Sequence, residues 1–164
     1  MKNTFKNKSI LITGGTGSFG STFIKTFLKR YKPKRLIIFS RDEQKHFKMQ
    51  DTFSDDPPSP VRYFLGDVRD VDRLDFAMRD VDIVIHTAAL KHVPLAEYNP
   101  FEVVKTNILG AQNIIQASIK NNVEKVIALS TDKASSPVNL YGATKLVSDK
   151  LFVAANNYKG KSKI

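Results

Sequence analysis

Short apolar runs alternate along the chain with stretches of helical spacing. Five apolar runs predict buried strands, at residues 8–13, 35–39, 61–65, 81–86 and 123–129. Apolar residues at helical spacing predict three helices, at residues 18–30, 100–121 and from 141 onward. Strands that alternate with helices are typical of a parallel sheet with helices on both faces. We therefore predict an α/β fold of the Rossmann type, a doubly wound parallel sheet.

The first predicted helix is expected to contribute to the core, and two of the stretches between elements are expected to be loops. Phe19, Phe23 and Phe27 recur every four residues, so we expect this phenylalanine stripe to be buried. Residues 55–60 hold three prolines and predict a surface loop. Residues 91–100 predict a polar loop whose side chains are able to contact a substrate.

Composition bounds the class of protein. The chain has 164 residues, 41% of them hydrophobic, which suits one domain with a substantial core. It lacks cysteine, which excludes disulfides and thiolate metal sites, and we predict no metal site. No apolar run approaches the roughly 20 residues of a membrane span, and residues 1–8 lack the apolar block of a secretory signal. We predict a cytoplasmic protein.

The charge balance is strongly basic, with 26 Lys and Arg against 16 Asp and Glu, a net charge of +10. Such a charge invites a nucleic-acid interpretation. The basic residues are, however, spread over helix surfaces and both ends, and they do not interleave with aromatic residues as stacking platforms do. We favour a solvated basic surface that attracts phosphate-bearing small molecules, and we predict no nucleic-acid partner.

The first predicted strand leads into a glycine-rich turn with the spacing Gly14-x-x-Gly17-x-x-Gly20. Gly14 allows a sharp turn off the strand, Gly17 a close approach to a pyrophosphate, and Gly20 tight packing of the next helix on the sheet. The N–H groups of that helix then face an anion. A glycine fingerprint alone is a weak signal, but here it lies between a predicted strand and a predicted helix, as a dinucleotide site requires.

The end of the second predicted strand is where such a fold meets the adenosine ribose. Ser40 and Arg41 favour a 2′-phosphate and hence NADP, and Lys45 adds a second cation. Asp42 and Glu43 lie in the same stretch, and an acidic residue at the strand end would favour a free 2′-hydroxyl. The alternative for Arg41 is an ordinary surface arginine.

Polar residues also follow the third and fourth predicted strands. Asp67 is placed to accept hydrogen bonds from adenine while Val68 packs on the ring, and Asp70 is equally suited to cap the next helix. His86 ends the fourth strand, and we favour a buried strand-end histidine over a base. In open α/β sheets, ligands bind at these carboxyl ends of the strands.

The fifth predicted strand leads into Ser130-Thr131-Asp132-Lys133, and a loop then leads to Tyr141 and Lys145. Four residues apart on a helix, the tyrosine and the lysine share one face. The nearby ammonium stabilises a phenolate, which a phenol needs to act as a base near neutral pH. For an isolated pair, a packed tyrosine beside a solvated lysine is the alternative. Together with the glycine turn and the strand-end hydroxyl groups, the pair predicts a catalytic site.

These residues resemble the extended short-chain dehydrogenase/reductase family, and within it the inverting UDP-N-acetylglucosamine 4,6-dehydratases of pseudaminic acid biosynthesis. The resemblance covers residues 10–160. It is carried by the strings Thr13-Gly-Gly-Thr-Gly-Ser-Phe-Gly20, Ser40-Arg-Asp-Glu43, Gly66-Asp-Val-Arg-Asp70, Lys91-His-Val-Pro94, Ala96-Glu-Tyr-Asn-Pro100, Leu129-Ser-Thr-Asp-Lys133 and Asn139-Leu-Tyr-Gly-Ala-Thr-Lys145. Membrane-attached relatives and those of the N-acetyl-L-fucosamine route typically carry methionine where Tyr141 stands, so Tyr141 favours the inverting branch.

The resemblance implies a mechanism. Tyr141, assisted by Lys145, would take the proton of the sugar C4 hydroxyl as hydride passes to NADP+, with Thr131 hydrogen-bonded near that hydroxyl. Lys133 would take the C5 proton and Asp132 would help water leave from C6, after which hydride returns to C6. Retaining sugar dehydratases usually carry glutamate where Lys133 stands, so this lysine fits inversion at C5. The division of acid and base work between Asp132 and Lys133 stays open.

The resemblance also implies NADP as the cofactor, UDP-N-acetylglucosamine as the substrate and a homo-oligomer. Residues 1–164 would be the NADP-binding domain of a longer dehydratase whose substrate-binding half is absent, and residues 162–164 would open the next strand. The substrate would contact Lys91, Thr131 and Tyr141. The cofactor would contact a larger set, namely Gly14, Thr16, Gly17, Ser18, Phe19, Gly20, Ser40, Arg41, Asp42, Glu43, Lys45, Asp67, Val68, Ala88, Ser130, Tyr141 and Lys145.

Two other functions stay open at the level of sequence. A nucleotide-sugar epimerase or reductase of the same superfamily also carries the tyrosine and the lysine, but lacks the pair Asp132 and Lys133 that elimination uses. A non-catalytic NADP-binding module is the second alternative. Such a module has no reason to keep Tyr141 and Lys145 in register on one helix.

Overall fold

The computed structural model describes residues 5–160 and residue 164. Within them, five strands form one parallel sheet in the order β3-β2-β1-β4-β5. This is the Rossmann order, so the predicted fold class is confirmed. The strands are β1 (Ser9–Thr13), β2 (Arg35–Ser40), β3 (Val61–Leu65), β4 (Ile83–His86) and β5 (Lys125–Ala128).

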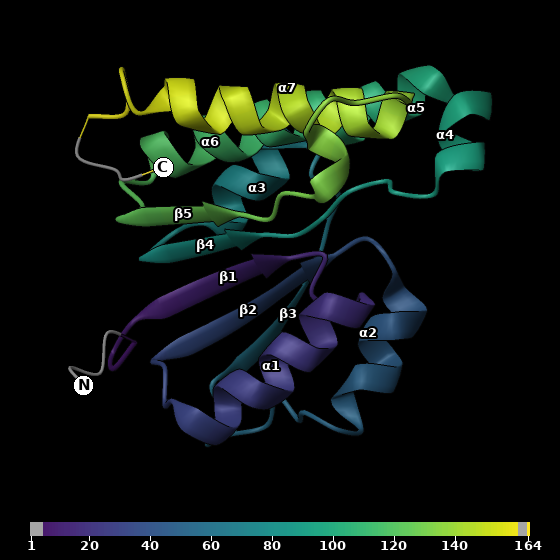
Figure 1. The fold of residues 1–164 in the computed structure, drawn as a ribbon. Coiled ribbons are helices and arrows are strands. Elements are labelled where there is room, and N and C mark those ends of the chain that lie inside the picture. The colour runs from purple at the N-terminus through teal and green to yellow at the C-terminus, as the bar shows by residue number, and fades with distance from the viewer. Residues whose placement is uncertain (1–4, 161–163) are drawn as a thin grey trace.

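Helices cover both faces of this sheet (Figure 1). One face carries α1 (Ser18–Arg30) and α2 (Glu43–Gln50). The other face carries α3 (Val71–Ala77), α6 (Gly110–Lys120) and α7 (Leu140–Ala155). Shorter segments complete the chain, namely α4 (Val93–Tyr98), α5 (Pro100–Val104), the π-helical turn η1 (Lys105–Leu109) and the 3₁₀ turn η2 (Asp132–Ala134).

The central strand contributes to two hydrophobic cores, one on each face of the sheet. Ile10 and Ile12 belong to the core that includes Ile24 of α1. Leu11 belongs to the core that includes Ile114 of α6. Successive side chains of a strand point to opposite faces, so a strand covered on both sides is apolar at every position. This explains why the inner strands β1 and β4, buried at every position, were recognisable as continuous apolar runs.

The predicted burial of the phenylalanine stripe on α1 is wrong for Phe19, at the start of the helix. Phe27 is buried, with 4% of its surface exposed, whereas Phe19 is 45% exposed. The first turn of α1 borders a cavity instead of the sheet, and Phe19 lies in that turn. Helical spacing identifies the face of a helix, but not how far the sheet extends beneath it.

Two predicted segments along the fourth crossover need correction. The helix expected over residues 100–121 is divided into α5, η1 and α6, because the N–H of Gly110 bonds to the C=O of Lys105, five residues earlier. The polar loop expected over residues 91–100 contains α4, whose first turn includes Pro94. The fixed φ of proline suits the first turn of a helix.

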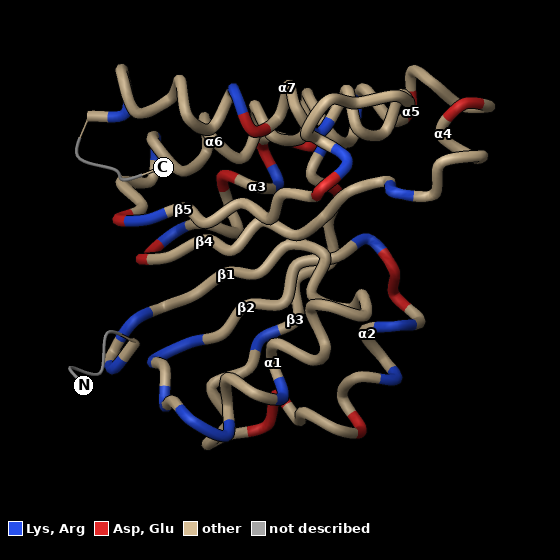
Figure 2. The backbone as a smooth tube through the Cα atoms, in the orientation of Figure 1, with Lys and Arg blue, Asp and Glu red and all other residues tan. Residues whose placement is uncertain are grey.

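The remaining predictions differ only in detail. β4 begins at Ile83 and β5 at Lys125, each inside its predicted range, and residues 55–60 form a surface loop as predicted. Figure 2 shows Lys and Arg on both helical layers with Asp and Glu among them, which matches the dispersed basic surface. No helix within the described residues is long and apolar enough to cross a membrane. The strand start expected at residues 162 and 163 lies outside the described residues.

Candidate active site

A cavity of about 360 Å³ opens at the carboxyl ends of the strands. Ligands of open α/β sheets bind in this place, and the volume is typical of a small-molecule site. Its walls come from the β1–α1 turn, from the segments after β2, β3, β4 and β5, from η1 and from α7. The lining residues are Gly14, Thr16, Gly17, Ser18, Phe19, Gly20, Phe39, Ser40, Arg41, Asp42, Lys45, Gly66, Asp67, Val68, Thr87, Ala88, Ala89, Leu90, Lys91, Thr106, Leu129, Ser130, Tyr141 and Lys145.

The β1–α1 turn requires glycine at two positions. Gly14 has a φ of +65°, and a Cβ there would lie 2.9 Å from the backbone N of Ala88. A Cβ on Gly20 would lie 2.5 Å from the Cα of Gly15. We had expected Gly20 to contact the sheet, but its close contact is with the glycine turn. The N-cap of α1 is Gly17, which has no side chain to bond the first N–H groups of the helix. These donors therefore suit a phosphate at the cavity wall.

At the end of β2, the carboxylate of Asp42 lines the cavity and is paired with a lysine. Ser40 Oγ lies 2.8 Å from Thr16 Oγ1, which ties β2 to the glycine turn. The Asp42 carboxylate caps α2 by accepting from the Lys45 N–H at 3.0 Å, and it pairs with Lys45 Nζ at 2.8 Å. The Lys45 side chain holds the pKa of Asp42 below its usual value. Glu43, by contrast, is exposed and does not line the cavity.

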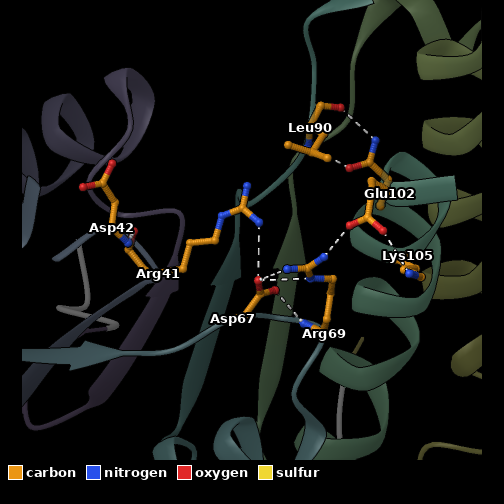
Figure 3. Close-up of polar contacts among 9 residues, drawn as sticks. Arg41, Asp42, Asp67, Arg69, Leu90, Glu102 and Lys105 are labelled. Carbon is orange, nitrogen blue, oxygen red and sulfur yellow. Dashed lines mark hydrogen bonds and ion pairs between the residues drawn. The ribbon is translucent and has the colours of Figure 1, made fainter. Parts of the chain in front are cut away.

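Asp67 follows β3 and lies between two arginines (Figure 3). Arg69 donates to its Oδ2 from Nε at 3.0 Å and from Nη2 at 2.8 Å, and Arg41 Nη1 lies 3.4 Å from the same oxygen. Val68 is buried and lines the cavity beside Asp67. Asp70 caps α3 through its side chain, which confirms the capping role predicted for it. Asp67 and Val68 thus line the cavity side by side, and Asp70 caps the helix.

Tyr141 and Lys145 lie one turn apart on α7, and both line the cavity. Lys145 is 5% exposed, and its Nζ donates to the backbone O of Leu129 at 2.7 Å. Burial lowers the pKa of Lys145, and the carboxylate of Asp149 opposes this shift. Ser130 donates a hydrogen bond from its Oγ to Asp149. The segment that follows β5 is therefore fixed to two successive turns of α7.

His86 is a buried strand-end histidine, as predicted. It is 2% exposed, and its Nδ1 lies 2.8 Å from Thr13 Oγ1. Burial lowers the pKa of His86 to about 3, and the charge of Lys145 acts in the same direction. The ring is therefore neutral at pH 7, and His86 does not line the cavity.

Asn107 of η1 supports the cavity wall, a role that the sequence did not predict. Its side chain accepts from the Leu90 N–H at 2.8 Å, and it donates to the Leu90 O at 2.9 Å and to Thr144 Oγ1 at 3.0 Å. Leu90 lines the cavity, and Thr144 lies on α7 between Tyr141 and Lys145. Asn107 thus joins a cavity wall to the helix of the tyrosine and the lysine. The signal in the sequence was a polar residue on the apolar face of the predicted helix.

Thr131, Asp132 and Lys133 do not line the cavity. The side chains of Asp132 and Lys133 are 86% and 50% exposed, and Lys133 Nζ lies 3.5 Å from Asp132 Oδ1. The Thr131 hydroxyl and Lys133 together hold the pKa of Asp132 below its usual value. The backbone of η2 nevertheless packs on the start of α7, because a Cβ on Gly142 would collide with the C=O of Lys133. The structure thus places the side chains of Asp132 and Lys133 toward solvent beside α7, while Thr131 is partly buried and its hydroxyl bonds within η2.

The cavity brings together most of the residues predicted for it. Every predicted cofactor residue except Glu43 lines it, and so do Lys91 and Tyr141 of the predicted substrate contacts. Within the described residues, no group of three or more His, Asp or Glu side chains is arranged to hold a metal ion. The sequence missed several lining residues, and all except Thr106 adjoin a predicted one; these are Phe39, Gly66, Thr87, Ala89, Leu90, Thr106 and Leu129.

The chain is similar in sequence to known proteins. The sequence profile described as "Polysaccharide biosynthesis protein" matches residues 10–164. The chain is 65% identical over 156 residues to a UDP-N-acetylglucosamine 4,6-dehydratase (inverting) of Campylobacter jejuni, a match that covers 95% of this chain and 46% of the relative. It is 46% identical over 153 residues to a UDP-glucose 4-epimerase of Rickettsia bellii, covering 92% of this chain and 44% of the relative. The chain thus spans less than half the length of these relatives.

Solved structures share the fold. The X-ray structure of Pen from Bacillus thuringiensis superposes with a TM-score of 0.91 at 46% identity, over 98% of this chain and 48% of that one. DesIV of Streptomyces venezuelae, a dTDP-glucose 4,6-dehydratase solved with NAD and TYD bound, superposes with a TM-score of 0.81 at 26% identity. That match covers 93% of this chain and 52% of DesIV. Both likenesses support the fold class of the chain.

Proposed function

Because the chain belongs to the polysaccharide biosynthesis protein family, we propose that it is the cofactor-binding part of a UDP-N-acetylglucosamine 4,6-dehydratase that inverts C5. The observation that carries this proposal is that Tyr141 and Lys145 line the same cavity as the glycine turn. The 65% identical relative supports both the substrate and the inverting course. The product would be UDP-2-acetamido-2,6-dideoxy-β-L-arabino-hex-4-ulose, made in the cytoplasm by a homo-oligomer for pseudaminic acid and surface glycans.

NADP is the cofactor that the cavity residues favour. Gly14 and Gly20 form the tight turn, and Gly17 caps α1 without a side chain, so a pyrophosphate would approach the first N–H groups of this helix. Arg41 and Lys45 supply positive charge, while Asp42 is engaged by α2 and by Lys45. A 2′-phosphate would therefore meet no uncompensated carboxylate at this end. When bound, the nicotinamide supplies the acceptor, and later the donor, of a hydride.

The residues near α7 take the proton-transfer roles. Tyr141 would take the proton of the sugar C4 hydroxyl, assisted by Lys145 one turn away on the same helix. Thr131 would hydrogen-bond near the same hydroxyl. Once C4 is a ketone, the C5 proton is acidic, and Lys133 would remove it while Asp132 assists the departure of water from C6. The exposed side chains on η2 are free to contact a sugar.

An epimerase is the second candidate, because a 46% identical relative is a UDP-glucose 4-epimerase. Epimerisation at C4 needs no elimination across C5 and C6, so Asp132 and Lys133 would have no task in it. A non-catalytic NADP-binding module is the third candidate. A Tyr141→Phe variant separates it from both enzymes, since loss of turnover with NADP still bound is expected only of an enzyme.

The test is incubation with NADP+ and UDP-N-acetylglucosamine in deuterated water, with the product analysed by NMR and mass spectrometry. We expect a 4-keto-6-deoxy sugar of L-arabino configuration with deuterium at C5. Retained configuration would reject inversion and keep dehydration, whereas a C4 epimer without loss of water would support the epimerase. The Campylobacter jejuni relative serves as the positive control. If only that relative reacts while this chain binds NADP+, the cavity proposal stands and turnover needs more protein than these residues.

A further inference from the structure

Four charged side chains of alternating sign extend from the cavity to α5, and they are called the charge chain: Arg41, Asp67, Arg69 and Glu102 (Figure 3). Arg69 Nη1 lies 2.7 Å from Glu102 Oε2. The other oxygen of Glu102 pairs with Lys105 Nζ at 2.9 Å. The charge chain therefore connects the ends of β2 and β3 with a helix more than thirty residues further along the sequence.

Arg69 makes most of the bonds to Asp67. Its Nε and Nη2 donate to Oδ2 at 3.0 and 2.8 Å, and its backbone N–H donates to Oδ1 at 3.0 Å. Arg41 lies farther from Oδ2, at 3.4 Å. Because a carboxylate offers about four acceptor positions, Oδ2 is filled and Oδ1 keeps one position unused. Asp67 lines the cavity, so a ligand bound there lies beside this carboxylate.

Glu102 holds Arg69 from the opposite edge. A guanidinium is planar and its N–H groups point in fixed directions, so a carboxylate on each edge fixes both its place and its rotation. Burial raises the pKa of Asp67, but the hydrogen bonds from Arg69 outweigh this effect, and the pKa lies below its usual value. Asp67 is therefore ionised at neutral pH, and an ionised carboxylate only accepts hydrogen bonds.

We infer that Arg69, anchored by Glu102, is a positioning residue of the adenosine subsite. It holds the carboxylate of Asp67 in the orientation in which Asp67 binds a 6-aminopurine in preference to a 6-oxopurine. This inference rests on the proposed function, because it needs an adenine dinucleotide in the cavity. The amino group of adenine donates to the unused position of Oδ1. A 6-oxo group would place the purine oxygen, an acceptor, against the Asp67 carboxylate, which is also an acceptor. A site that binds a donor discriminates against an analogue that lacks this donor.

The test compares the affinities of NADPH and its hypoxanthine analogue, measured by titration of nicotinamide fluorescence. For the unaltered chain we expect NADPH to bind about tenfold more tightly or better, as a hydrogen bond to a charged group provides. Arg69→Met should reduce this ratio to about two or less, because Asp67 is no longer held. Glu102→Gln should reduce it by a smaller factor. The control Lys120→Met removes an exposed ion pair with Asp75, of 2.9 Å, and should leave the ratio unchanged.

The ratio of the two affinities separates positioning from a general structural effect, because a loosened cavity weakens both dinucleotides alike. An unaltered ratio in Arg69→Met overturns the inference, as does equal affinity of the unaltered chain for both ligands. If the unaltered chain binds neither ligand, the proposed cofactor is refuted and the inference falls with it. Should Arg69→Met fail to fold by circular dichroism, the half-exposed Glu102→Gln decides, and an unchanged ratio there overturns the inference.

Discussion

Replacing Asn107 with leucine should destabilise the fold, because this buried side chain makes three hydrogen bonds among η1, the segment after β4 and α7. Leucine fills a similar volume but carries no polar atom. The N–H and C=O of Leu90 would lose their partners, while Thr144 Oγ1 would keep its bond to the Tyr141 O at 2.8 Å. Each buried polar group left without a partner costs about 1–3 kcal/mol.

The two Leu90 groups are partly buried, so we expect the free energy of unfolding to fall by about 2–4 kcal/mol. At about 2–4 °C per kcal/mol for a domain of this size, the midpoint of thermal unfolding should fall by roughly 4–16 °C. Urea titration and thermal denaturation followed by circular dichroism measure both quantities. Asn113→Leu is the matched control, since it removes one hydrogen bond, from Asn113 Nδ2 to the Val68 O at 3.0 Å. Its cost should be about 1 kcal/mol.

Equal losses of stability in Asn107→Leu and Asn113→Leu would refute this reasoning, because the triple contact would then count for no more than a single one. Cofactor affinity gives an independent check. Leu90 lines the cavity, so Asn107→Leu should bind NADPH more weakly than the unaltered chain does, at a temperature where both are folded.

Three further substitutions test other parts of the site. Gly14→Ala should lower both the unfolding midpoint and the NADPH affinity, because the residue has a φ of +65° and no room for a Cβ, and an unchanged affinity would contradict it. Gly142→Ala should reduce kcat more than NADPH affinity, since the added Cβ would displace the backbone of Lys133 and with it η2. Equal losses of kcat and of NADPH affinity would contradict this prediction. His86 has a pKa of about 3 in the folded chain and of 6.5 in the unfolded chain, so the unfolded chain binds the proton first as the pH falls. The stability that neutral His86 contributes is therefore full above pH 6.5 and is lost as the pH falls toward 3. Urea titrations at about pH 7 and pH 4.5 should therefore show a smaller acid loss for His86→Leu than for the unaltered chain, and equal losses would disprove the assignment.

The strands and the glycine turn were predictable because local sequence determines them. Ile10, Leu11 and Ile12 are apolar in succession since both faces of β1 are covered, and Gly14 is needed for a backbone angle that other residues avoid. The predicted partners Tyr141 and Lys145 needed only the spacing of one helix.

The features that were missed depend on contacts between distant segments. The π-helical turn η1 accompanies hydrogen bonds from Asn107 to Leu90 and Thr144, which no local pattern in residues 100–121 contains. The exposure of Phe19 depends on where the sheet ends beneath α1. The place of Asp132 and Lys133 outside the cavity lining depends on how η2 packs against α7.

The wide turn η1 also sets the rotational phase of α6 relative to α5. Each residue of an α-helix turns the chain by about 100°, so deleting one residue between 105 and 109 would rotate α6 by that angle about its own axis. Ile114 and Ile115, both fully buried, would swing away from the sheet. A deletion in the surface loop at residues 55–60 would only shorten a connection. Variation in chain length is therefore compatible with this architecture at its loops and incompatible with it at η1, where the number of residues matters as much as their identity.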